Sequence, residues 1–372
     1  MEYIDGANKI LKMLEDNGFE GYIVGGYVRD ILFGIDSHDI DITTNARVDD
    51  LKKIFNTRDN GSKYSSVTVI MDSNEYEVTT YRRDVLYADH RHPDIEITDN
   101  VSDDLKRRDY TINALLMDRF GNIIDEYDGR NDMENHIVRM IGDPYERYDE
   151  DALRILRGIY LVAKLEFKLS DDTFEAMTSK APLLEYVSDG RKRKELDKII
   201  KFNSNNRALK AMVDTNVFRY LKGLDKGILY MLSRKVYVND PFMFYALAFK
   251  LNGMVIKSYE FEKSFGKMLE AVIKESMKSL EPVEMLDSDI EILKKANELK
   301  RLAGEEYIDN IEDAYNNLII HSIKDVNVDK EALKEICGNE INDVLKEIAS
   351  KILEGKLTNT NEEILRFVEK VK

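Results

Sequence analysis

Residues 22–44 read YIVGGYVRDILFGIDSHDIDITT, and this stretch decides the fold. Residues 22–24 are apolar, which predicts a short strand, and they run directly into Gly25 and Gly26. Residues 28–33 then have the spacing of one or two helical turns. A strand that ends in glycines and opens a helix exposes backbone N–H groups at the positive helix terminus. The stretch therefore predicts a phosphate seat, although glycine pairs are also common in ordinary turns.

Two acidic residues follow the glycines. Asp39 and Asp41 alternate with Ile40 and Ile42, so a strand here would place both carboxylates on one face and bury the isoleucines on the other. Carboxylates this close repel each other unless a cation compensates, and hard oxygen ligands suit Mg²⁺. We therefore predict a catalytic Mg²⁺ site at these two aspartates rather than a solvated edge strand. Glu77, in a neighbouring predicted strand, is a candidate third ligand or orienting group.

Composition sets limits on the class of protein. The chain has 372 residues, of which 43% are hydrophobic and 34% charged, as expected for a soluble globular protein of two to four domains. It shows no bilayer-spanning run and no leader, so we expect a cytoplasmic location and no membrane partner. The single cysteine, Cys337, excludes an intrachain disulfide. The net charge of −16 implies that any RNA is held on local patches.

The patterns along the chain predict two kinds of architecture. Strand signals at 67–71 and 76–81 predict a hairpin, and 115–118 with 123–125 predict another. After Pro144 the spacing is helical throughout. We therefore predict an α/β head on a mixed sheet, followed by an all-α remainder.

A second cluster of polar residues lies at 105–114. Arg108 stands beside Asp109, and Asn113 would lie one turn further along if Asp109 opens a helix. Such a set could bind a ribose hydroxyl and a phosphate together. A surface helix with a capping aspartate would account for the same residues.

A third cluster, DEDALRILR, covers residues 149–157. On a helix, Asp151, Arg154 and Arg157 would share one face, and the first two could simply form an ion pair. A carboxylate also accepts from an exocyclic amine, while a guanidinium donates to ring nitrogens or carbonyl oxygens. Cytosine and adenine both offer an amine beside an acceptor, whereas uracil and guanine place an oxygen opposite the carboxylate. The pair Asp151 and Arg154 would then accept C or A and reject U or G.

The motifs GGxVRD, DxD, RRDxTINA and EDxxR occur in this order between residues 20 and 200. The series resembles the class II tRNA nucleotidyltransferases, which are the bacterial-type CCA-adding enzymes and their poly(A) polymerase relatives within the DNA polymerase beta-like superfamily. The resemblance implies Mg²⁺-dependent, template-independent addition of CCA to the tRNA 3′ end from CTP and ATP, with release of pyrophosphate. It also implies a catalytic head at 1–137, a helical neck for base recognition at 138–205, and a helical body and tail for tRNA binding at 206–372.

The same resemblance carries residue roles onto the matching positions. Asp39 and Asp41 match the catalytic metal ligands. The residues that match nucleotide contacts are Gly25, Gly26, Arg29, Arg108, Asp109, Asn113, Asp151, Arg154 and Arg157. The residues that match supporting positions are Glu150, Arg191 and Glu195, with Gly190 standing where the family usually has glutamate.

Residues 83–93, RDVLYADHRHP, resemble the flexible loop that CC-adding relatives lack, with Asp84 and Tyr87 matching the element tied to addition of the terminal A. The loop does not separate a CCA-adding from an A-adding enzyme. A poly(A) polymerase is a further alternative, but the C-terminal part lacks the strongly basic extension of that branch. A non-catalytic tRNA-binding protein is another alternative, and the presence of both Asp39 and Asp41 opposes it. An antibiotic nucleotidyltransferase would not need the base-reading pair. The basic run 191–194 could contact tRNA phosphates, or could be a solvated helix face.

Overall fold

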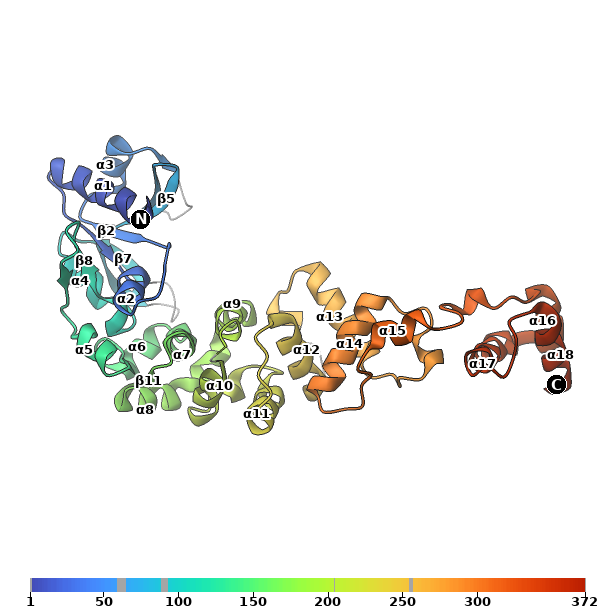
Figure 1. Ribbon diagram of the computed structural model, residues 1–372. Coiled ribbons are helices and arrows are strands. Elements are labelled where there is room, and N and C mark those ends of the chain that lie inside the picture. The colour runs from blue at the N-terminus through green and yellow to red at the C-terminus, as the bar shows by residue number, and fades with distance from the viewer. Residues whose placement is uncertain (1, 59–64, 88–92, 204, 254–256, 372) are drawn as a thin grey trace. The chain divides into compact units, whose positions relative to one another are not determined.

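The computed structural model describes residues 2–58, 65–87, 93–203, 205–253 and 257–371. The chain divides into two compact units, Met1–Lys222 and Gly223–Lys372. Within the described ranges, all strands belong to the first unit, and the regular structure of the second unit is helical (Figure 1). The predicted succession of an α/β head and a helical remainder is confirmed, with one exception among the described residues, the two-residue strand β11 Lys168–Leu169 within the remainder.

The head is built on a seven-stranded sheet with the order β3-β4-β5-β2-β1-β8-β9. Its strands are β1 Gly21–Val24, β2 Asp41–Thr44, β3 Thr57–Arg58, β4 Ser66–Met71, β5 Asn74–Thr80, β8 Leu116–Met117 and β9 Ile123–Ile124. β2 runs parallel to β5 and antiparallel to β1, so the sheet is mixed. Both predicted hairpins are confirmed. The first has a shorter turn than its sequence predicts, because positive φ angles at Asp72 and Ser73 close it in two residues.

Four helices accompany the sheet: α1 Glu2–Asp16, α2 Gly26–Leu32, α3 Val48–Ile54 and α4 Val101–Lys106. α1 packs against β1, β4 and β5 and fully buries Ala7, Ile10 and Leu14, which recur at helical spacing. This packing is close, since a Cβ at Gly6 would lie 2.2 Å from the Tyr76 hydroxyl.

The predicted flexible loop forms, at its two ends, a β-ribbon. β6 Arg82–Tyr87 pairs antiparallel with β7 Pro93–Ile97, with an irregular register between Asp84 and Leu86. Residues 88–92, which contain the middle of the predicted loop, lie outside the described residues. The flexibility of the loop stays a prediction.

Helices form most of the rest of the first unit. They are η1 Thr111–Asn113, α5 Gly129–Glu134, α6 Pro144–Glu150, α7 Leu153–Leu165, α8 Asp171–Lys180, η2 Ala181–Tyr186, α9 Asp189–Ile200, α10 Asn205–Asp214 and η3 Val217–Tyr220, joined by the parallel pair β10 Ile137–Val138 and β11 Lys168–Leu169. α7 is central, because it packs against α6, α9 and α10. A Cβ at Gly158 in this helix would lie 2.3 Å from the Tyr110 hydroxyl, so the glycine lets α7 approach the head closely.

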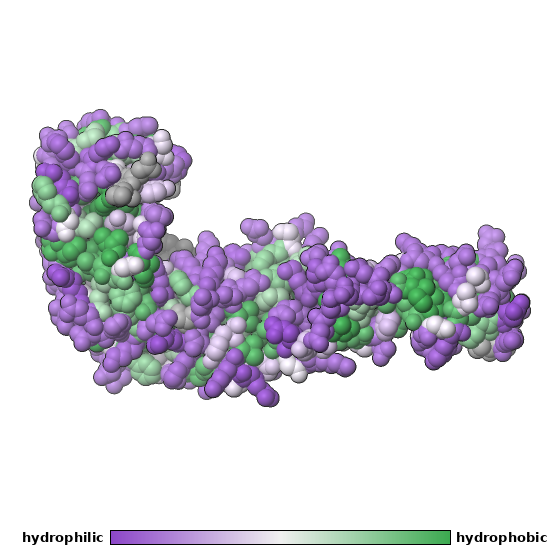
Figure 2. Space-filling model, viewed as in Figure 1, coloured by the Kyte–Doolittle hydropathy of each residue, from purple (hydrophilic) through white to green (hydrophobic). Residues whose placement is uncertain are grey.

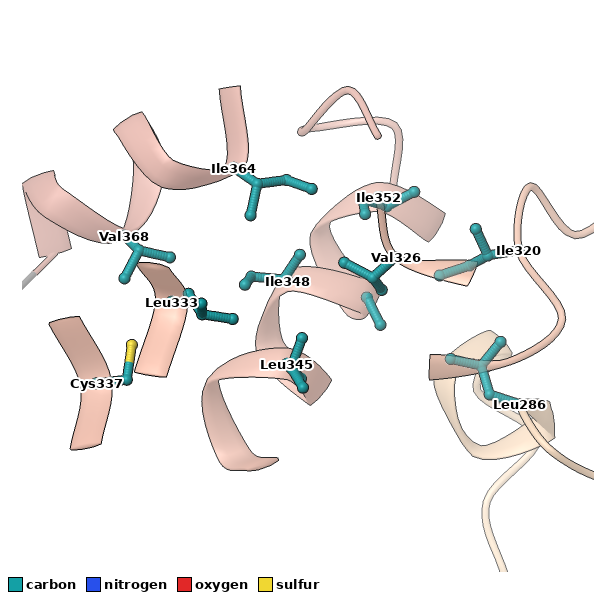
Figure 3. Close-up of a cluster of buried hydrophobic side chains, with 11 residues drawn as sticks. Leu286, Ile320, Val326, Leu333, Cys337, Leu345, Ile348, Ile352, Ile364 and Val368 are labelled. Atoms are coloured by element: carbon teal, nitrogen blue, oxygen red, sulfur yellow. The ribbon is translucent and has the colours of Figure 1, made fainter. Parts of the chain in front are cut away.

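The described part of the second unit consists of helices. They are α11 Asp225–Arg234, α12 Pro241–Asn252, η4 Lys257–Tyr259, α13 Lys263–Glu275, η5 Pro282–Met285, α14 Ile290–Leu302, α15 Ile311–Asn316, η6 Ile323–Asp325, α16 Lys330–Cys337, η7 Gly338–Glu340, α17 Ile341–Leu353 and α18 Asn361–Val371. Figure 3 shows side chains of α16, α17 and α18 meeting in one apolar cluster, which includes Leu333, Ile348 and Ile364. Cys337 is buried in this cluster as a free thiol.

The visible surface of each unit is mostly hydrophilic, with smaller hydrophobic areas between the polar ones (Figure 2). Across the residues that the structure covers, none of the helices combines the length and the apolar character needed to cross a bilayer.

Candidate active site

A pocket of about 430 Å³ in the first unit brings most of the predicted site together. The predicted residues that line it are Gly25, Gly26, Arg29, Asp39, Asp41, Asp84, Arg108, Asp109, Asn113, Asp151, Arg154 and Arg157. The lining residues that the sequence analysis did not name are Tyr27, Asp30, Ser37, Arg82, Arg107, Tyr160 and Lys164. Seven basic and six acidic side chains line the pocket, so it is not acidic although the chain carries a net charge of −16. Such a pocket can hold a polyanion.

Gly25 and Gly26, where β1 runs into α2, are the predicted phosphate site and are named here the glycine seat. The backbone of Gly25 has a φ of 80° and a ψ of −137°, which glycine adopts freely and residues with a side chain do not. A Cβ there would lie 3.4 Å from Arg108 Nη1 and 3.8 Å from Asp41 Oδ2. The bare backbone thus lies beside both a guanidinium and a carboxylate. α2 begins at Gly26, two residues earlier than its apolar spacing predicts.

The two predicted metal ligands do not share a strand. β2 begins at Asp41, which pairs with Val24, the last residue of β1. Because Gly25 turns the chain away, the residues before Asp41 have no partner on that side, and Asp39 lies in the preceding loop with its side chain exposed. The prediction that both aspartates lie on one face of a strand is wrong, yet both line the pocket.

The carboxyl group of Asp41 lies near two other acidic side chains, Asp39 and Glu77, and this part of the site is called the acidic corner. Burial, and then the charges of Asp39 and Glu77, raise the pKa of Asp41 to about 6, while Arg108 acts in the opposite direction. Glu77 aligns with Asp41 in the parallel pair of β2 and β5, but it is exposed and does not line the pocket. In the described part of the chain, no group of three or more His, Cys, Asp or Glu side chains is placed to hold a metal. The corner therefore offers two carboxylates whose mutual repulsion a cation would relieve.

Arg108 is held by a buried acid that the sequence analysis missed. Asp104 of α4 is fully buried and lies 2.8 Å from Arg107 Nη2 and 3.2 Å from Arg108 Nη2. Burial acts to raise the pKa of Asp104, but the two arginines outweigh it and hold the pKa below its ordinary value. Arg108 lies two residues beyond the end of α4, and its spacing of four residues from Asp104 is the signal that could have found this pair.

Asp109 does not open a helix, which was the condition for placing Asn113 one turn further along. Tyr110 is extended and forms an isolated bridge with Met140, so helical structure starts only at η1. Asn113 Nδ2 instead donates back to Asp109 Oδ1 at 3.0 Å, and Arg157 Nε lies 3.2 Å from Asp109 Oδ2. Burial acts to raise the pKa of Asp109, but Arg157 and these hydrogen bonds lower it overall. Asp109 is thus an ionised acceptor at the pocket wall.

Arg29 and Asn113 meet at the same wall. Arg29 is only 3% exposed; its Nη2 lies 2.6 Å from Asp30 Oδ1, and its Nη1 donates to Asn113 Oδ1. Lys164 Nζ, from α7, lies 2.6 Å from the other oxygen of Asp30. The predicted phosphate ligand therefore belongs to a buried network that reaches across to α7.

Asp151 is not part of α7. α6 ends at Glu150 and α7 begins at Leu153, with Asp151 extended between them at φ −145° and ψ 102°. Its Oδ1 accepts from Leu153 N at 3.0 Å, so the side chain bonds the first residue of the helix that it was expected to belong to. The expectation that Asp151 lies on one helix with Arg154 and Arg157 is wrong, but Asp151 and Arg154 both line the pocket.

Arg154 is 5% exposed and firmly held. Its Nη1 donates to Glu150 Oε2 at 2.6 Å and to the carbonyl of Arg147 at 2.8 Å. Arg147 also contacts Glu150, and its Nη2 donates to the carbonyls of Arg107 and Arg108 at 2.7 and 2.6 Å. Glu150 thus joins two arginines, one of which clamps the main chain of the 107–108 segment.

The predicted supporting residues Arg191 and Glu195 lie on α9. Arg191 Nη2 approaches Asp151 Oδ1 to 3.9 Å, and the carboxylate of Glu195 is among the charges that raise the pKa of Arg157, after that of Asp109. Within the basic run 191–194, Lys192 is only 3% exposed and pairs with Asp189 at 2.7 Å. Lys192 therefore serves the fold and is not a candidate for contact with RNA phosphates.

Gly25 and Gly26 beside one carboxylate of a mixed sheet and a second from the preceding loop, with the Asp151 and Arg154 pair in the same pocket, are typical of a nucleotidyltransferase site. The comparisons agree with this class. Residues 21–139 match the family "Poly A polymerase head domain", residues 166–227 match "Probable RNA and SrmB- binding site of polymerase A", and residues 256–368 match "tRNA nucleotidyltransferase domain 2".

Relatives narrow the class to one family. The chain is 34% identical to a CCA-adding enzyme of Streptococcus gordonii, covering 98% of this chain and 97% of the relative. It is 33% identical to a CCA-adding enzyme of Bacillus licheniformis, with the same coverage. The solved structure of the Bacillus stearothermophilus CCA-adding enzyme in complex with CTP matches with a TM-score of 0.76 and 26% identity, covering 100% of this chain and 98% of that one. The chain belongs to the family of CCA-adding enzymes.

Proposed function

We propose that this protein adds CCA to the 3′ ends of tRNA from CTP and ATP, releasing pyrophosphate and using no nucleic-acid template. The observation that carries the proposal is that one pocket is lined by Gly25, by Asp39 and Asp41, and by Asp151 and Arg154. The similarity to CCA-adding enzymes over nearly the whole chain supports it.

The acidic corner fits a Mg²⁺ ion. Asp39 and Asp41 present hard oxygen donors, and Mg²⁺ in nucleotide enzymes is typically held by one or two carboxylates together with substrate phosphates. The raised pKa of Asp41 marks uncompensated negative charge that a cation would offset. We propose that these two aspartates hold Mg²⁺, while Glu77, outside the pocket, would act on Asp41 through its negative charge. When bound there, the ion would supply Lewis-acid activation of the tRNA 3′-hydroxyl and neutralise charge on the phosphates.

The residues of the chain then position the reactants. The exposed backbone at Gly25 and Gly26, with the guanidinium groups of Arg29 and Arg108, would bind the triphosphate. The tRNA 3′-oxygen forms a bond to the α-phosphorus, the bond from that phosphorus to the bridging oxygen breaks, and pyrophosphate leaves. The hydroxyl proton passes to solvent, since we assign no general base. Asp109 would accept from a ribose hydroxyl, because it stays ionised at the pocket wall.

The base would be chosen by two side chains that are fixed before the nucleotide arrives. Asp151 is oriented by Leu153 N and approached by Arg191, while Arg154 is held by Glu150. Because these contacts already order the two side chains, binding of the base loses little further side-chain entropy. An acceptor beside a donor array suits the edges of C and A and opposes those of U and G.

We further propose that residues 1–137 carry the chemistry, 138–205 the base choice, and 206–372 the tRNA contacts. Duplex RNA hides its base edges in a deep groove, so the acceptor stem would be recognised by its shape and its phosphates. The exposed Lys194, on α9 and outside residues 206–372, is a further candidate for contact with RNA phosphates. A cytoplasmic location is part of the same proposal.

The reaction can be tested on tRNA transcripts that end before CCA, after C, or after CC. Each is incubated with the protein and Mg²⁺, with CTP and ATP supplied separately and together. We expect extension to CCA on all three transcripts and no further growth. Extension of the CC-ended transcript alone would instead identify an A-adding enzyme, and long A tails on unrelated RNA would identify a poly(A) polymerase. A lack of incorporation on every substrate would favour a non-catalytic binding protein.

The metal assignment is tested by Asp39→Ala. We expect incorporation to fall at least a thousandfold while tRNA binding in a gel-shift assay stays near normal, because the aspartate acts on the reaction and not on the RNA body. Asp36→Ala is the matched control, since Asp36 is an exposed acid of the same loop that does not line the pocket. Retained activity in Asp39→Ala would refute the assignment.

The base-reading assignment is tested by Asp151→Ala. We expect the preference for CTP over UTP to fall by at least tenfold, because the acceptor for the exocyclic amine is gone. Asp149→Ala is the control, since Asp149 pairs with Lys180 and does not line the pocket. Unchanged discrimination in Asp151→Ala would defeat the assignment.

A further inference from the structure

Helix α2 connects the glycine seat with the base-reading helix α7. It starts at Gly26, in the seat, and it ends at Leu32. Just beyond its end, the Phe33 ring meets the Phe167 ring edge-on, with centroids 5.1 Å apart, and Phe167 lies two residues after the end of α7. One short helix therefore touches the seat at one end and the α7 segment at the other.

An ion pair makes a second connection from the middle of α2. Asp30 Oδ2 accepts from Lys164 Nζ of α7 at 2.6 Å, while Asp30 Oδ1 lies 2.6 Å from Arg29 Nη2. Asp30 is 3% exposed and the Lys164 side chain 17% exposed, so water screens this pair poorly and the geometry is well defined. Arg29 continues the network to Asn113. The connection thus includes a residue that we assign to the triphosphate.

The same helix α7 carries Arg154, one of the two residues that we assign to base choice. Arg154 and Lys164 are ten residues apart on it, which corresponds to a rise of about 15 Å. A helix does not stretch over this distance, so fixing Lys164 against Asp30 also fixes Arg154 relative to the glycine seat. The base and the triphosphate belong to one nucleotide. The base must therefore reach the base-reading pair while the triphosphate lies in the glycine seat.

We propose that Lys164 and Asp30 are positioning residues that fix the spacing between the triphosphate seat and the base-reading pair. Together with the contact of Phe33 on Phe167 they form a tie, named here the α2–α7 tie. The inference rests on the proposed function. The tie holds the α-phosphate of a nucleotide, whose base is already recognised, in line with the tRNA 3′-hydroxyl. Errors in such alignment cost rate more than affinity.

The test is Lys164→Met in the full-length protein. Asp30 keeps Arg29 as its partner in this variant, so no buried carboxylate is left without a cation. With CTP and a transcript lacking CCA, we expect kcat to fall about 10- to 100-fold. We expect KM for CTP to change less than threefold, tRNA binding to stay unchanged, and misincorporation of UTP relative to CTP to rise severalfold. Lys164→Arg should restore kcat to within about fivefold of the wild type.

Lys180→Met is the matched control. Lys180 Nζ lies 2.6 Å from Asp149 Oδ2, the same separation as in the Lys164 pair, but neither residue lines the pocket. This variant should keep kcat within twofold. If Lys164→Met does not fold, as judged by its thermal transition, Phe33→Ala tests the same tie without removing a charge, and the same loss of kcat at constant KM is expected.

Four results would overturn the inference. A lower melting temperature with normal kcat would reduce Lys164 to a structural role. A raised KM for CTP at constant kcat would make Lys164 a direct ligand of the nucleotide. A wild-type protein that extends no tRNA would remove the proposed function, and the inference with it, whereas an active wild type beside a normal Lys164→Met removes the inference alone.

Discussion

Asp41→Asn should make the metal-free protein more stable. Burial, Asp39 and Glu77 raise the pKa of the Asp41 carboxyl from 3.8 to about 6. Between these two pH values the folded chain binds more protons at this site than the unfolded chain. The free energy of unfolding therefore falls as the pH rises through this window, and it stays lower above pH 6. Asparagine has nearly the same shape and cannot ionise, so it escapes this penalty.

The size of the effect follows from the shift. A shift of about two pKa units corresponds to roughly 3 kcal/mol, at about 1.4 kcal/mol per unit. We therefore expect Asp41→Asn to raise the free energy of unfolding of the first unit by about 2–3 kcal/mol at pH 7. For a unit of this size, about 2–4 °C per kcal/mol corresponds to a gain in melting temperature of roughly 5–10 °C. At pH 4 the gain should nearly vanish, because the wild-type carboxyl is then largely protonated.

The assay is thermal unfolding followed by circular dichroism in buffer with EDTA, at pH 4 and pH 7. Glu185→Gln is the control, because it makes the same chemical change at an exposed position. Added Mg²⁺ should raise the melting temperature of the wild type more than that of Asp41→Asn, since a cation that binds the folded state stabilises it. A gain of equal size at pH 4 and pH 7 would refute the reasoning, because the effect would then not come from ionisation.

Three further substitutions test the packing and charge of the site. Gly158→Ala should cost about 1–3 kcal/mol and lower CTP incorporation, because its Cβ would meet the Tyr110 hydroxyl at 2.3 Å; an unchanged denaturant midpoint would contradict this. Asp104→Asn should cost about 3–5 kcal/mol at pH 7, because two arginines lose a fully buried partner. Because the pKa of Asp104 is lowered, the difference in the free energy of unfolding between the wild type and Asp104→Asn should shrink as the pH falls below 4. A difference that does not change with pH would argue against the pairing. Gly25→Ala should cost about 1–2 kcal/mol because φ is 80°, and should lower kcat/KM for CTP; normal values of both would exclude strain at the seat.

The sequence is a good guide where the signal is local. Alternating apolar residues predict the strands and hairpins of the head, and the order of the motifs predicts which residues line the pocket. The sequence does not predict the local structure where a contact with another part of the chain determines it. Asp39 lies outside the strand because β1 ends opposite Asp41, and this register cannot be read from the alternation itself. Asp151 lies outside α7 because its side chain bonds a backbone N–H two residues on, in competition with the helix. The contact of Asp30 with Lys164 joins residues 134 positions apart, and no local pattern encodes it.

The clamp of Arg147 on the carbonyls of Arg107 and Arg108 has a consequence for evolution. Every amino acid has a main-chain carbonyl, so these hydrogen bonds do not depend on which side chains stand at positions 107 and 108. Substitutions there would leave this hydrogen bonding to Arg147 in place, although they would remove a partner of the buried Asp104 carboxylate. Glu150, which holds both Arg147 and Arg154, has no such freedom, because its role depends on its own carboxylate.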